Sequence, residues 1–437
     1  VIEDLPILDV EYDEILLTAP SIKGDQLRRI INICKLTGKK YKTVPSLSEL
    51  IDKDISIKTI RNVSYLDLLG RDEVKLDMNS IENLMHGKRV LITGAGGSIG
   101  SELVRQCLVF KPLEIICVDN SEHNIFSLEQ ELSTKNDETI IKYYFCNINE
   151  VGELEIPFQD NQPQLVFHAA ANKHVPIQAL HPWSAVKTNI GGTLNLVKLS
   201  DKYRVELFVL VSTDKAVNPV NVMGATKRTA EKIIQSFDVE SKTNFMAVRF
   251  GNVLGSSGSA IPIFEKQIKS GGPLTITHPE MTRYFMSIQE ASQLILQCGA
   301  IGKKGEIFLL KMGKPIKILQ MVKDLIRLSG LEPEIDIPIV FTGLRPGEKL
   351  YEELQLKDEK IIYTKYSKIM ILDGINSIEP WNLLKKKIIS ILIAGEELDS
   401  DKIQYTLKSI TPTYEPRFAT RIKDNEVKKF GEVEIHA

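Results

Sequence analysis

The sequence predicts an α/β protein: a doubly wound parallel sheet, a smaller C-terminal lobe, and an extra, degenerate α/β domain at the N-terminal end. Two observations carry this prediction. Residues 89–100, RVLITGAGGSIG, indicate an apolar strand that passes through a glycine-rich turn into a helix. Between residues 88 and 250, short apolar runs alternate with helical patterns, which is typical of βαβ units with helices on both faces of the sheet.

The glycine turn has the chemistry of a dinucleotide site. Gly94, Gly97 and Gly100 are set three residues apart, and apolar residues at helical spacing follow them. Glycines let the backbone approach a pyrophosphate, and the start of a helix offers N–H groups and a positive dipole end. The residues expected to contact a cofactor here are Gly94, Gly96, Gly97, Ser98, Ile99 and Gly100.

A carboxylate follows the second strand at the position that a ribose requires. Residues 115–118 are apolar, and Asp119 closes the run about 20 residues after the turn. Asp119 would bind the adenosine ribose and repel a 2′-phosphate, and no arginine follows it in Asn120-Ser121-Glu122. The sequence therefore predicts NAD rather than NADP as the cofactor. Asn120, the next residue, is also expected to contact the cofactor.

Ligands of parallel α/β sheets lie at the carboxyl ends of the strands, and polar residues gather there in this sequence. The expected strands are residues 90–92, 115–118, 140–145, 165–168, 207–211 and 245–250. Their ends add Asn147, Ile148, Ala169, Ala170, Ala171 and Ser212 to the expected cofactor contacts. His168, at one strand end, is expected to be a hydrogen-bonded structural histidine rather than a catalyst.

The chain divides into three expected segments. The first, residues 1–85, is the small α/β domain, the second, 86–255, binds NAD, and the third, 256–437, forms the lobe and tail. A part of the third segment could return to the NAD-binding domain and pack there. The elements expected outside the sheet are strands at 14–19 and 41–44, helices at 26–36, 47–51 and 381–393, and a polar linker at 70–83.

Composition excludes several classes of protein. The 437 residues carry a net charge of −2, so no basic excess is available to neutralise nucleic-acid phosphates. The five cysteines lie in apolar segments without metal or redox spacing, which is typical of a reduced cytoplasmic protein and predicts no metal site. No run approaches the ~18 apolar residues of a membrane span. Because the sequence starts at Val1, we expect a fragment whose missing N-terminal part could hold an anchor.

A second informative stretch, STDKAVNPVNVMGATKR, runs from residue 212. Ser212 and Thr213 end a strand, and Lys227 follows on a helix, where it could bind the nicotinamide ribose and lower the pKa of a neighbouring acid. Met223 lies one turn before Lys227 on the same helical face.

These motifs resemble the extended short-chain dehydrogenase/reductase superfamily, which has the Rossmann fold: TGxxGxxG at 93–100, Asp119, the alanines after residue 168, Ser212-Thr213 and a YxxxK-like helix position. Within it, five segments resemble the UDP-N-acetylglucosamine 4,6-dehydratases of the large, membrane-anchored type used for bacterial surface polysaccharides and glycans. These segments are VFHAAANKHVP (166–176), STDKAVNP (212–219), RFGNVLGSSGS (249–259), THPEMTRYFM (277–286) and GLRPGEKLYEEL (343–354). The likeness spans roughly 88–415, and residues 15–75 resemble that type's extra domain, which follows its membrane helices.

The sequence departs from the superfamily at three positions. Met223 stands where the catalytic tyrosine is usual, although the large dehydratases look similar here. Lys215 replaces the glutamate of many sugar-nucleotide dehydratases and matches the UDP-N-acetylglucosamine branch. Asn147 stands where relatives usually carry aspartate near the adenine, and it keeps an acceptor oxygen.

The resemblance implies a cytoplasmic dehydratase that acts on UDP-N-acetylglucosamine with NAD, placed at the cytoplasmic face of the inner membrane if the full-length protein carries an anchor. Oxidation at C4 acidifies the C5 proton, water leaves from C6, and hydride returns to C6. Lys215 is the expected base, provided that burial and positive neighbours keep it partly neutral, and Asp214, with a raised pKa, is the expected acid. Thr213 would relay the C4 hydroxyl proton to Asp214 or to solvent, because Met223 cannot accept a proton.

Further expectations concern the substrate and the assembly. A homodimer or higher homo-oligomer is implied, because the helix that carries Met223 and Lys227 pairs between subunits in the superfamily. Arg345 suits a diphosphate, although Arg345 and Glu348 could simply shape a turn. The residues expected to bind substrate are Lys173, Thr213, Asn252, His278, Arg283, Arg345 and Glu348.

Two other functions stay open. A UDP-sugar 4-epimerase also oxidises C4, but it has no use for the acid and base that Asp214 and Lys215 provide. A non-catalytic nucleotide-binding regulator that has lost the tyrosine would not need Thr213, Asp214, Lys215 and Lys227 together.

Overall fold

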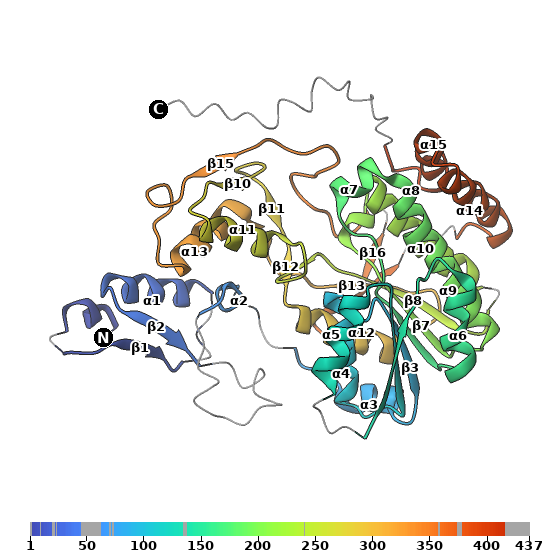
Figure 1. The fold of residues 1–437 in the computed structure, drawn as a ribbon, viewed down its shortest axis with the longest axis horizontal. Coiled ribbons are helices and arrows are strands. Elements are labelled where there is room, and N and C mark those ends of the chain that lie inside the picture. The colour runs from blue at the N-terminus through green and yellow to red at the C-terminus, as the bar shows by residue number, and fades with distance from the viewer. Residues whose placement is uncertain are drawn as a thin grey trace.

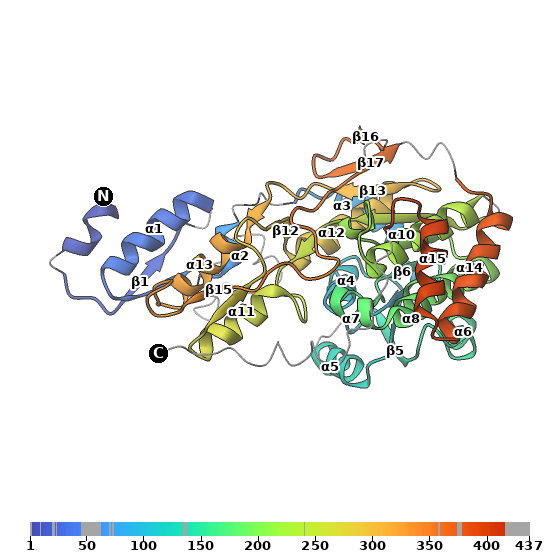
Figure 2. The same ribbon diagram turned by 90° about the horizontal axis from the view of Figure 1, so that it is seen from above.

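The structure, a computed structural model, describes residues 2–8, 10–19, 22, 24–44, 63–69, 71, 74–133, 138–239, 241–356, 359–373 and 378–415. The molecule is elongated. The N-terminal unit lies at one end, the large sheet domain lies at the other, and a smaller lobe with α11 and α13 lies between them (Figures 1 and 2).

A nine-stranded sheet, counted over the described residues, forms the centre of the large domain, in the order β16-β17-β13-β8-β7-β6-β3-β4-β5. The run from β13 to β5 is parallel throughout, and β17 and β16 add an antiparallel edge. This confirms the doubly wound parallel α/β fold. The strands are β3 (Arg89–Thr93), β4 (Glu114–Asp119), β5 (Ile140–Phe145), β6 (Leu165–His168), β7 (Leu207–Val211), β8 (Asn244–Arg249), β13 (Ile307–Leu310), β16 (Lys360–Tyr363) and β17 (Ile369–Asp373).

Helices cover both faces of the sheet, because successive strand side chains point to opposite faces and both sets are apolar. In β3, Leu91 packs into the apolar cluster on one face, and Val90 and Ile92 pack into the cluster on the other. The first cluster draws on α6 (Val151–Asn161), α8 (Pro182–Ala185), η4 (Val186–Gly192), α9 (Thr193–Lys202), α10 (Val222–Asp238), α14 (Trp381–Glu396) and α15 (Ser400–Ile410). The second draws on α3 (Met78–Met85), α4 (Ser98–Leu108), α5 (Glu122–Leu132) and α12 (Ile288–Ile301).

Helix α3 begins within residues 70–83, where the sequence indicates a linker, and ends two residues beyond that stretch. Asp77 caps it by accepting a hydrogen bond from the Ser80 amide at 3.2 Å. Ile81 and Met85, one turn apart, are fully buried against the second cluster. Residues 78–85 are therefore part of the sheet domain. Their two buried apolar residues stand among polar residues in the sequence, so the local pattern does not indicate a buried helix.

The chain returns to the sheet after residue 287, through α12, β13, β16, β17, α14 and α15. The lobe keeps a third apolar cluster, in which α11 and α13 pack against short strands. Its elements are α11 (Ala260–Lys269), α13 (Ile318–Leu328), β10 (Leu274–Ile276), β11 (Thr282–Arg283), β14 (Ile316–Lys317) and β15 (Ile339–Phe341), and β9 (Asn252–Val253) pairs with β12 (Phe285–Met286) where the lobe joins the sheet domain.

The N-terminal unit docks on this lobe. Leu27 and Ile31 of α1 share the third cluster with α13, and Arg28 Nε lies 3.1 Å from Asp324 Oδ2. The expected strand–helix–strand order is present, whereas the helical turn expected at 47–51 lies outside the described residues. The unit comprises η1 (Ile2–Ile7), β1 (Glu14–Leu17), α1 (Gly24–Leu36), β2 (Lys40–Thr43), which pairs in parallel with β1, and α2 (Tyr65–Leu68).

Helix α10 packs against helix α14 of the same chain. Ile233 and Ile234 are fully buried and share the first cluster with Leu384 and Ile388 of α14. Figure 1 shows α14 and α15 lying against the α10 side of the domain. Ile233 and Ile234 are therefore covered by the same chain, while the pairing of this helix between subunits and the oligomeric state stay predictions. None of the helices among the described residues combines the length and apolarity that crossing a membrane requires.

Candidate active site

A cavity of about 850 Å³ opens at the carboxyl ends of β3 and β6. The chain runs outward from β3 to β4 and β5 and then returns to the opposite side of β3 as β6. The two connections diverge at this point of the sheet and leave a crevice between them. The lobe closes the far wall of the cavity with residues from 250–264, 275–285 and 345–348.

The glycine turn is packed so tightly that side chains are excluded. Gly94 has a φ of +65°, and a Cβ there would lie 2.7 Å from the Ala170 nitrogen. A Cβ on Gly100 would lie 1.9 Å from the Gly94 oxygen, and one on Gly96 would lie 2.4 Å from Asn124 Cβ. The start of α4 can therefore face the cavity with backbone alone. Its residues on the cavity wall are Gly97, Ser98, Ile99 and Gly100.

Asp119 ties the end of β4 to this turn. Its carboxylate accepts hydrogen bonds from the amides of Gly96 and Ser121, both at 2.9 Å. A carboxylate offers about four acceptor positions, so two remain for a ribose. Asp119 itself lies beside the cavity, not on the wall described by its lining residues.

Several other expected cofactor residues are not on the cavity wall either. The side-chain oxygen of Asn147 accepts from the Asn149 amide at 3.1 Å, and Ile148 is buried in the first cluster. Asn120 is exposed. Ala169 and Ala171 line the cavity, whereas Ala170, like Gly96, packs within the turn. The sequence places these residues at the right strand ends, but it does not show which way each one faces.

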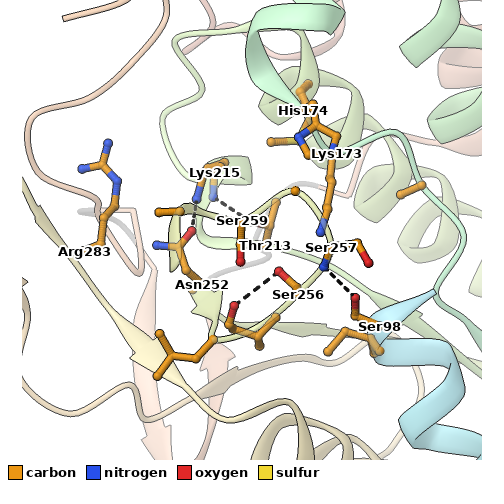
Figure 3. A pocket seen from close by; sticks show the side chains of 18 of the residues that line it. Ser98, Lys173, His174, Thr213, Lys215, Asn252, Ser256, Ser257, Ser259 and Arg283 are labelled. Carbon is orange, nitrogen blue, oxygen red and sulfur yellow. Dashed lines mark hydrogen bonds between the residues drawn. The ribbon is translucent and has the colours of Figure 1, made fainter. Parts of the chain in front are cut away.

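Thr213, Asp214 and Lys215 are brought together after β7, where Asp214 begins η5 (Asp214–Ala216). The Thr213 hydroxyl donates to Asp214 Oδ1 at 2.9 Å, and Lys215 Nζ donates to the same oxygen at 3.0 Å. Lys215 also donates to Asn252 Oδ1 at 3.2 Å (Figure 3). Asp214 is fully buried, and its Oδ2 has no hydrogen-bond partner. A hydroxyl, a carboxylate and an amine are thus joined in one hydrogen-bonded group.

The charge environment of Lys215 differs from the expectation that positive neighbours keep it partly neutral. Burial lowers the pKa of the Lys215 ammonium, but the carboxylates of Asp214 and Glu352 outweigh burial and raise the pKa above its ordinary value. Arg283 opposes them only weakly. Lys215 is therefore an ammonium at neutral pH in this arrangement.

Met223 and Lys227 lie on the cavity side of α10, which begins after Asn221. Gly224 lets the helix approach η5, since a Cβ there would lie 2.2 Å from the Lys215 oxygen. Met223 is almost fully buried. Lys227 Nζ donates to the Val211 oxygen at 2.7 Å, and burial lowers the pKa of Lys227 to about 8. Lys227, not Lys215, is thus the lysine with a lowered pKa, and burial is the cause, opposed by the charge of Glu231.

Ser212, on the cavity wall, is hydrogen-bonded to a buried ion-pair network that was not predicted from the sequence. Its hydroxyl donates to Glu231 Oε1 at 2.6 Å, and Arg249, with no exposed surface, pairs with Glu231 at 2.7 Å and Glu359 at 2.9 Å. The available signal was an arginine at the end of the apolar strand 245–250. The network fixes α10 against β7 and β8.

The loop that follows β6 supplies Lys173 to the cavity, and β9 supplies Asn252. The lobe supplies Arg283, Arg345 and Glu348. The Arg283 guanidinium donates to the carbonyl oxygens of Thr282, Lys349 and Leu350. Several of its N–H groups therefore hold the segment after β15 in place beside the cavity.

His278 is not on the cavity wall, because its Nδ1 accepts from the Glu280 amide within a local turn. His168 is confirmed as structural: both ring nitrogens bond to threonine hydroxyls, of Thr93 at 2.8 Å and of Thr193 at 3.0 Å.

The loop 255–259 is a further part of the wall that the sequence analysis did not identify as a site. The Ser257 amide donates to Ser98 Oγ at 3.0 Å, so this loop contacts the start of α4 (Figure 3). A Cβ on Gly258 would lie 2.6 Å from the His174 ring. The glycine and serine spacing of the loop was visible in the sequence, but its contact with Ser98 depends on the tertiary fold.

Comparison with known proteins identifies relatives of the chain. A capsular polysaccharide biosynthesis protein, CapD of Staphylococcus aureus, is 48% identical over 373 residues, which are 84% of this chain and 62% of that protein. The chain thus spans about three fifths of this relative's length. A UDP-N-acetylglucosamine 4,6-dehydratase (inverting) of Campylobacter jejuni is 33% identical over 63% of this chain and 80% of the relative.

Epimerases and a solved structure are also similar. A UDP-glucose 4-epimerase of Rickettsia bellii is 35% identical over 62% of this chain and 79% of the relative. The X-ray structure of Pen from Bacillus thuringiensis is 36% identical, with a TM-score of 0.62, over 67% of this chain and 88% of that one. Residues 90–374 match the family described as polysaccharide biosynthesis protein. That match covers most of the chain and includes every residue that lines the cavity. The chain therefore belongs to the polysaccharide biosynthesis protein family.

Proposed function

We propose that this protein is an NAD-dependent dehydratase that converts UDP-N-acetylglucosamine into the corresponding 6-deoxy-4-keto sugar nucleotide. The observation that carries the proposal is that Thr213 and Lys215, both on the cavity wall, share hydrogen bonds to the buried carboxylate of Asp214. A dehydration needs both an acid and a base, and these neighbouring residues supply a carboxyl group and an amine.

The residues of the turn fit NAD. The glycines exclude side chains from the path of a diphosphate, the first amides of α4 have no intrahelical acceptor, and Asp119 keeps acceptor positions for a ribose. Lys227 lies on the same wall, where its amine could bind the nicotinamide ribose. When bound, NAD would supply an acceptor and donor of hydride.

The chain's own residues would manage the protons. Thr213 would pass the proton of the C4 hydroxyl to Asp214, with which it is already hydrogen-bonded. Asp214 would then give this proton to the C6 hydroxyl, which leaves as water. Lys215, in the fraction of the enzyme in which its amine has lost its proton, would remove the C5 proton and return it to C5 afterwards, so the residues end the cycle as they began it.

Met223 would take no part in the transfer of the C4 hydroxyl proton, which falls to Thr213. A thioether neither donates nor accepts a proton usefully, so the methionine would shape the sugar pocket. Arg345, from the lobe, and Lys173, from the loop that follows β6, would bind the diphosphate of the substrate.

A UDP-sugar 4-epimerase is the second candidate, because an epimerase is among the similar proteins. It would leave the Asp214–Lys215 contact without a role. Incubation with UDP-N-acetylglucosamine and NAD, followed by mass spectrometry, separates the two. Loss of one water supports the dehydratase, and a product of unchanged mass supports the epimerase. No conversion would contradict both and favour a nucleotide-binding regulator.

A further inference from the structure

Two carboxylates, not one, lie against the amine of Lys215. Lys215 Nζ is 3.0 Å from Asp214 Oδ1 and 3.5 Å from Glu352 Oε1. Asp214 adjoins Lys215 in the chain, whereas Glu352 comes from the segment that follows β15. Both carboxylates are buried, and so their charges act on Lys215 with little screening by solvent.

The partners of Glu352 set it apart from other carboxylates of its segment. Glu348 accepts from the Arg345 amide, and Glu359 accepts from the Leu356 amide in addition to its ion pair with Arg249, so both hold backbone amides. The interactions recorded for Glu352 within the described structure are with two cations, Lys215 and Arg283, each at 3.5 Å. Its Oε2 has no hydrogen-bond partner. A buried carboxylate placed in this way acts through its charge.

Lys215 has few other charged neighbours. Asp214 faces it from η5, Glu352 from the segment after β15, and Arg283 from β11. Arg283 Nη2 in turn lies 3.8 Å from Glu348. Lys349, in the same segment as Glu352, is engaged by the Val217 oxygen and by Glu353.

We propose that Glu352 is a positioning residue for Lys215, which holds the amine between Asp214 and Asn252 and sets the pH at which Lys215 becomes a base. This inference rests on the proposed dehydratase function. It assigns a role to a residue 137 positions away from Lys215 in the chain, which the loop over the cavity brings into contact with it.

The direction of the effect follows from charge. Lys215 works as a base only after losing its proton, so the rate rises with pH through the pKa of Lys215. Glu352 stabilises the ammonium and moves this rise to higher pH. Removing its charge while keeping its shape, as in Glu352→Gln, moves the rise to lower pH by about one to three pH units.

The first experiment measures kcat/KM for water loss against pH in the wild type, Glu352→Gln and Glu352→Asp. We expect a lower-pH rise in Glu352→Gln and a smaller shift in the same direction in Glu352→Asp, whose shorter carboxylate lies farther from Lys215. Glu353→Gln is the matched control, because Glu353 is exposed and pairs with Lys349, and its profile stays that of the wild type. A slower Glu352→Gln with an unshifted profile would overturn the proposal, since loss of packing alone gives that result.

The second experiment does not need activity. Lys215 lines the cavity, and its reaction with an amine-acetylating reagent can be followed against pH by peptide mass spectrometry. We expect Lys215 to react at lower pH in Glu352→Gln, and an unchanged profile would contradict the proposal. If Glu352→Gln does not fold, Glu352→Asp serves both measurements and must show the smaller shift. A wild type that does not dehydrate its substrate contradicts the proposed function instead.

Discussion

Met223 is the residue at which this site departs most from the tyrosine-dependent pattern. It is 3% exposed, lines the cavity and lies one turn before Lys227. Its position supports a packing role. Met223→Leu should therefore keep most of the activity, within about tenfold, or about 1.4 kcal/mol of barrier. A variant that binds cofactor and substrate normally in calorimetry, yet loses about a thousandfold in rate, would show that the sulfur has a role beyond packing.

Lys215 carries the elimination in this account. In Lys215→Ala, Thr213 and Asp214 keep their hydrogen bond, so we expect substrate to reduce the cofactor, seen by absorbance, without loss of water, seen by mass. Lys317→Ala is the control, because Lys317 pairs with Glu280 on the exposed surface. Full dehydration by Lys215→Ala would transfer the role of base to Lys227, whose pKa burial lowers to about 8, or to Lys173.

At the scale of elements, the Arg249 network joins α10 to β8 and to the segment before β16. Arg249→Met would leave the buried carboxylates of Glu231 and Glu359 without their arginine, and we expect a loss of about 3–5 kcal/mol in the free energy of unfolding by urea. Lys88→Met, which breaks the exposed pair with Glu206, should cost about 0–1 kcal/mol. Equal costs would mean that the network contributes no more than a surface pair.

The same network predicts a pH dependence of stability. Burial raises the pKa of Glu231, but Arg249 and Arg228 outweigh burial and lower it to about 2. Because the pKa in the folded state lies below the ordinary 4.5, this stabilisation is complete above pH 4.5 and is lost as pH falls toward 2. Glu231→Gln should remove that part of the acid sensitivity in urea titrations, and an unchanged slope of stability with pH would contradict it.

Elements also show what the sequence could predict. Six of the seven strands of the parallel run appear within about a residue of their expected bounds, because five of them are buried, apolar runs and β5 is rich in residues typical of strands. Strand β13 was not predicted. Helix α3 was missed, since its two buried residues, Ile81 and Met85, stand among polar ones. In the site, Thr213, Asp214 and Lys215 adjoin in sequence and could be predicted together. The contact of Glu352 with Lys215 could not, because no local pattern records a contact across that many residues.

At the scale of the whole molecule, α14 and α15 pack against a face of α10, the helix that was expected to pair between subunits. Leu384 of α14 is fully buried there. Leu384→Ala should reduce the free energy of unfolding by about 2–5 kcal/mol and leave the mass measured by light scattering unchanged. A change of mass with unchanged stability would place this face at a subunit interface.

Arg71, which follows the N-terminal unit in the chain, contacts both the sheet domain and the lobe wall. Arg71 Nε lies 2.6 Å from Glu290 Oε2 on α12, and its Nη1 donates to the Phe285 oxygen at 2.9 Å. The segment that follows the N-terminal unit is thereby fixed to both the sheet domain and the lobe wall that borders the cavity.

Dehydration through C4 oxidation can be followed with UDP-N-acetylglucosamine that carries deuterium at C4. We expect a product that has lost one water and carries the deuterium at C6, because the hydride taken from C4 is returned there. Mass spectrometry measures the loss of water, and NMR measures the position of the deuterium. Deuterium retained at C4 in a product of unchanged mass would contradict the dehydratase proposal and identify an epimerase.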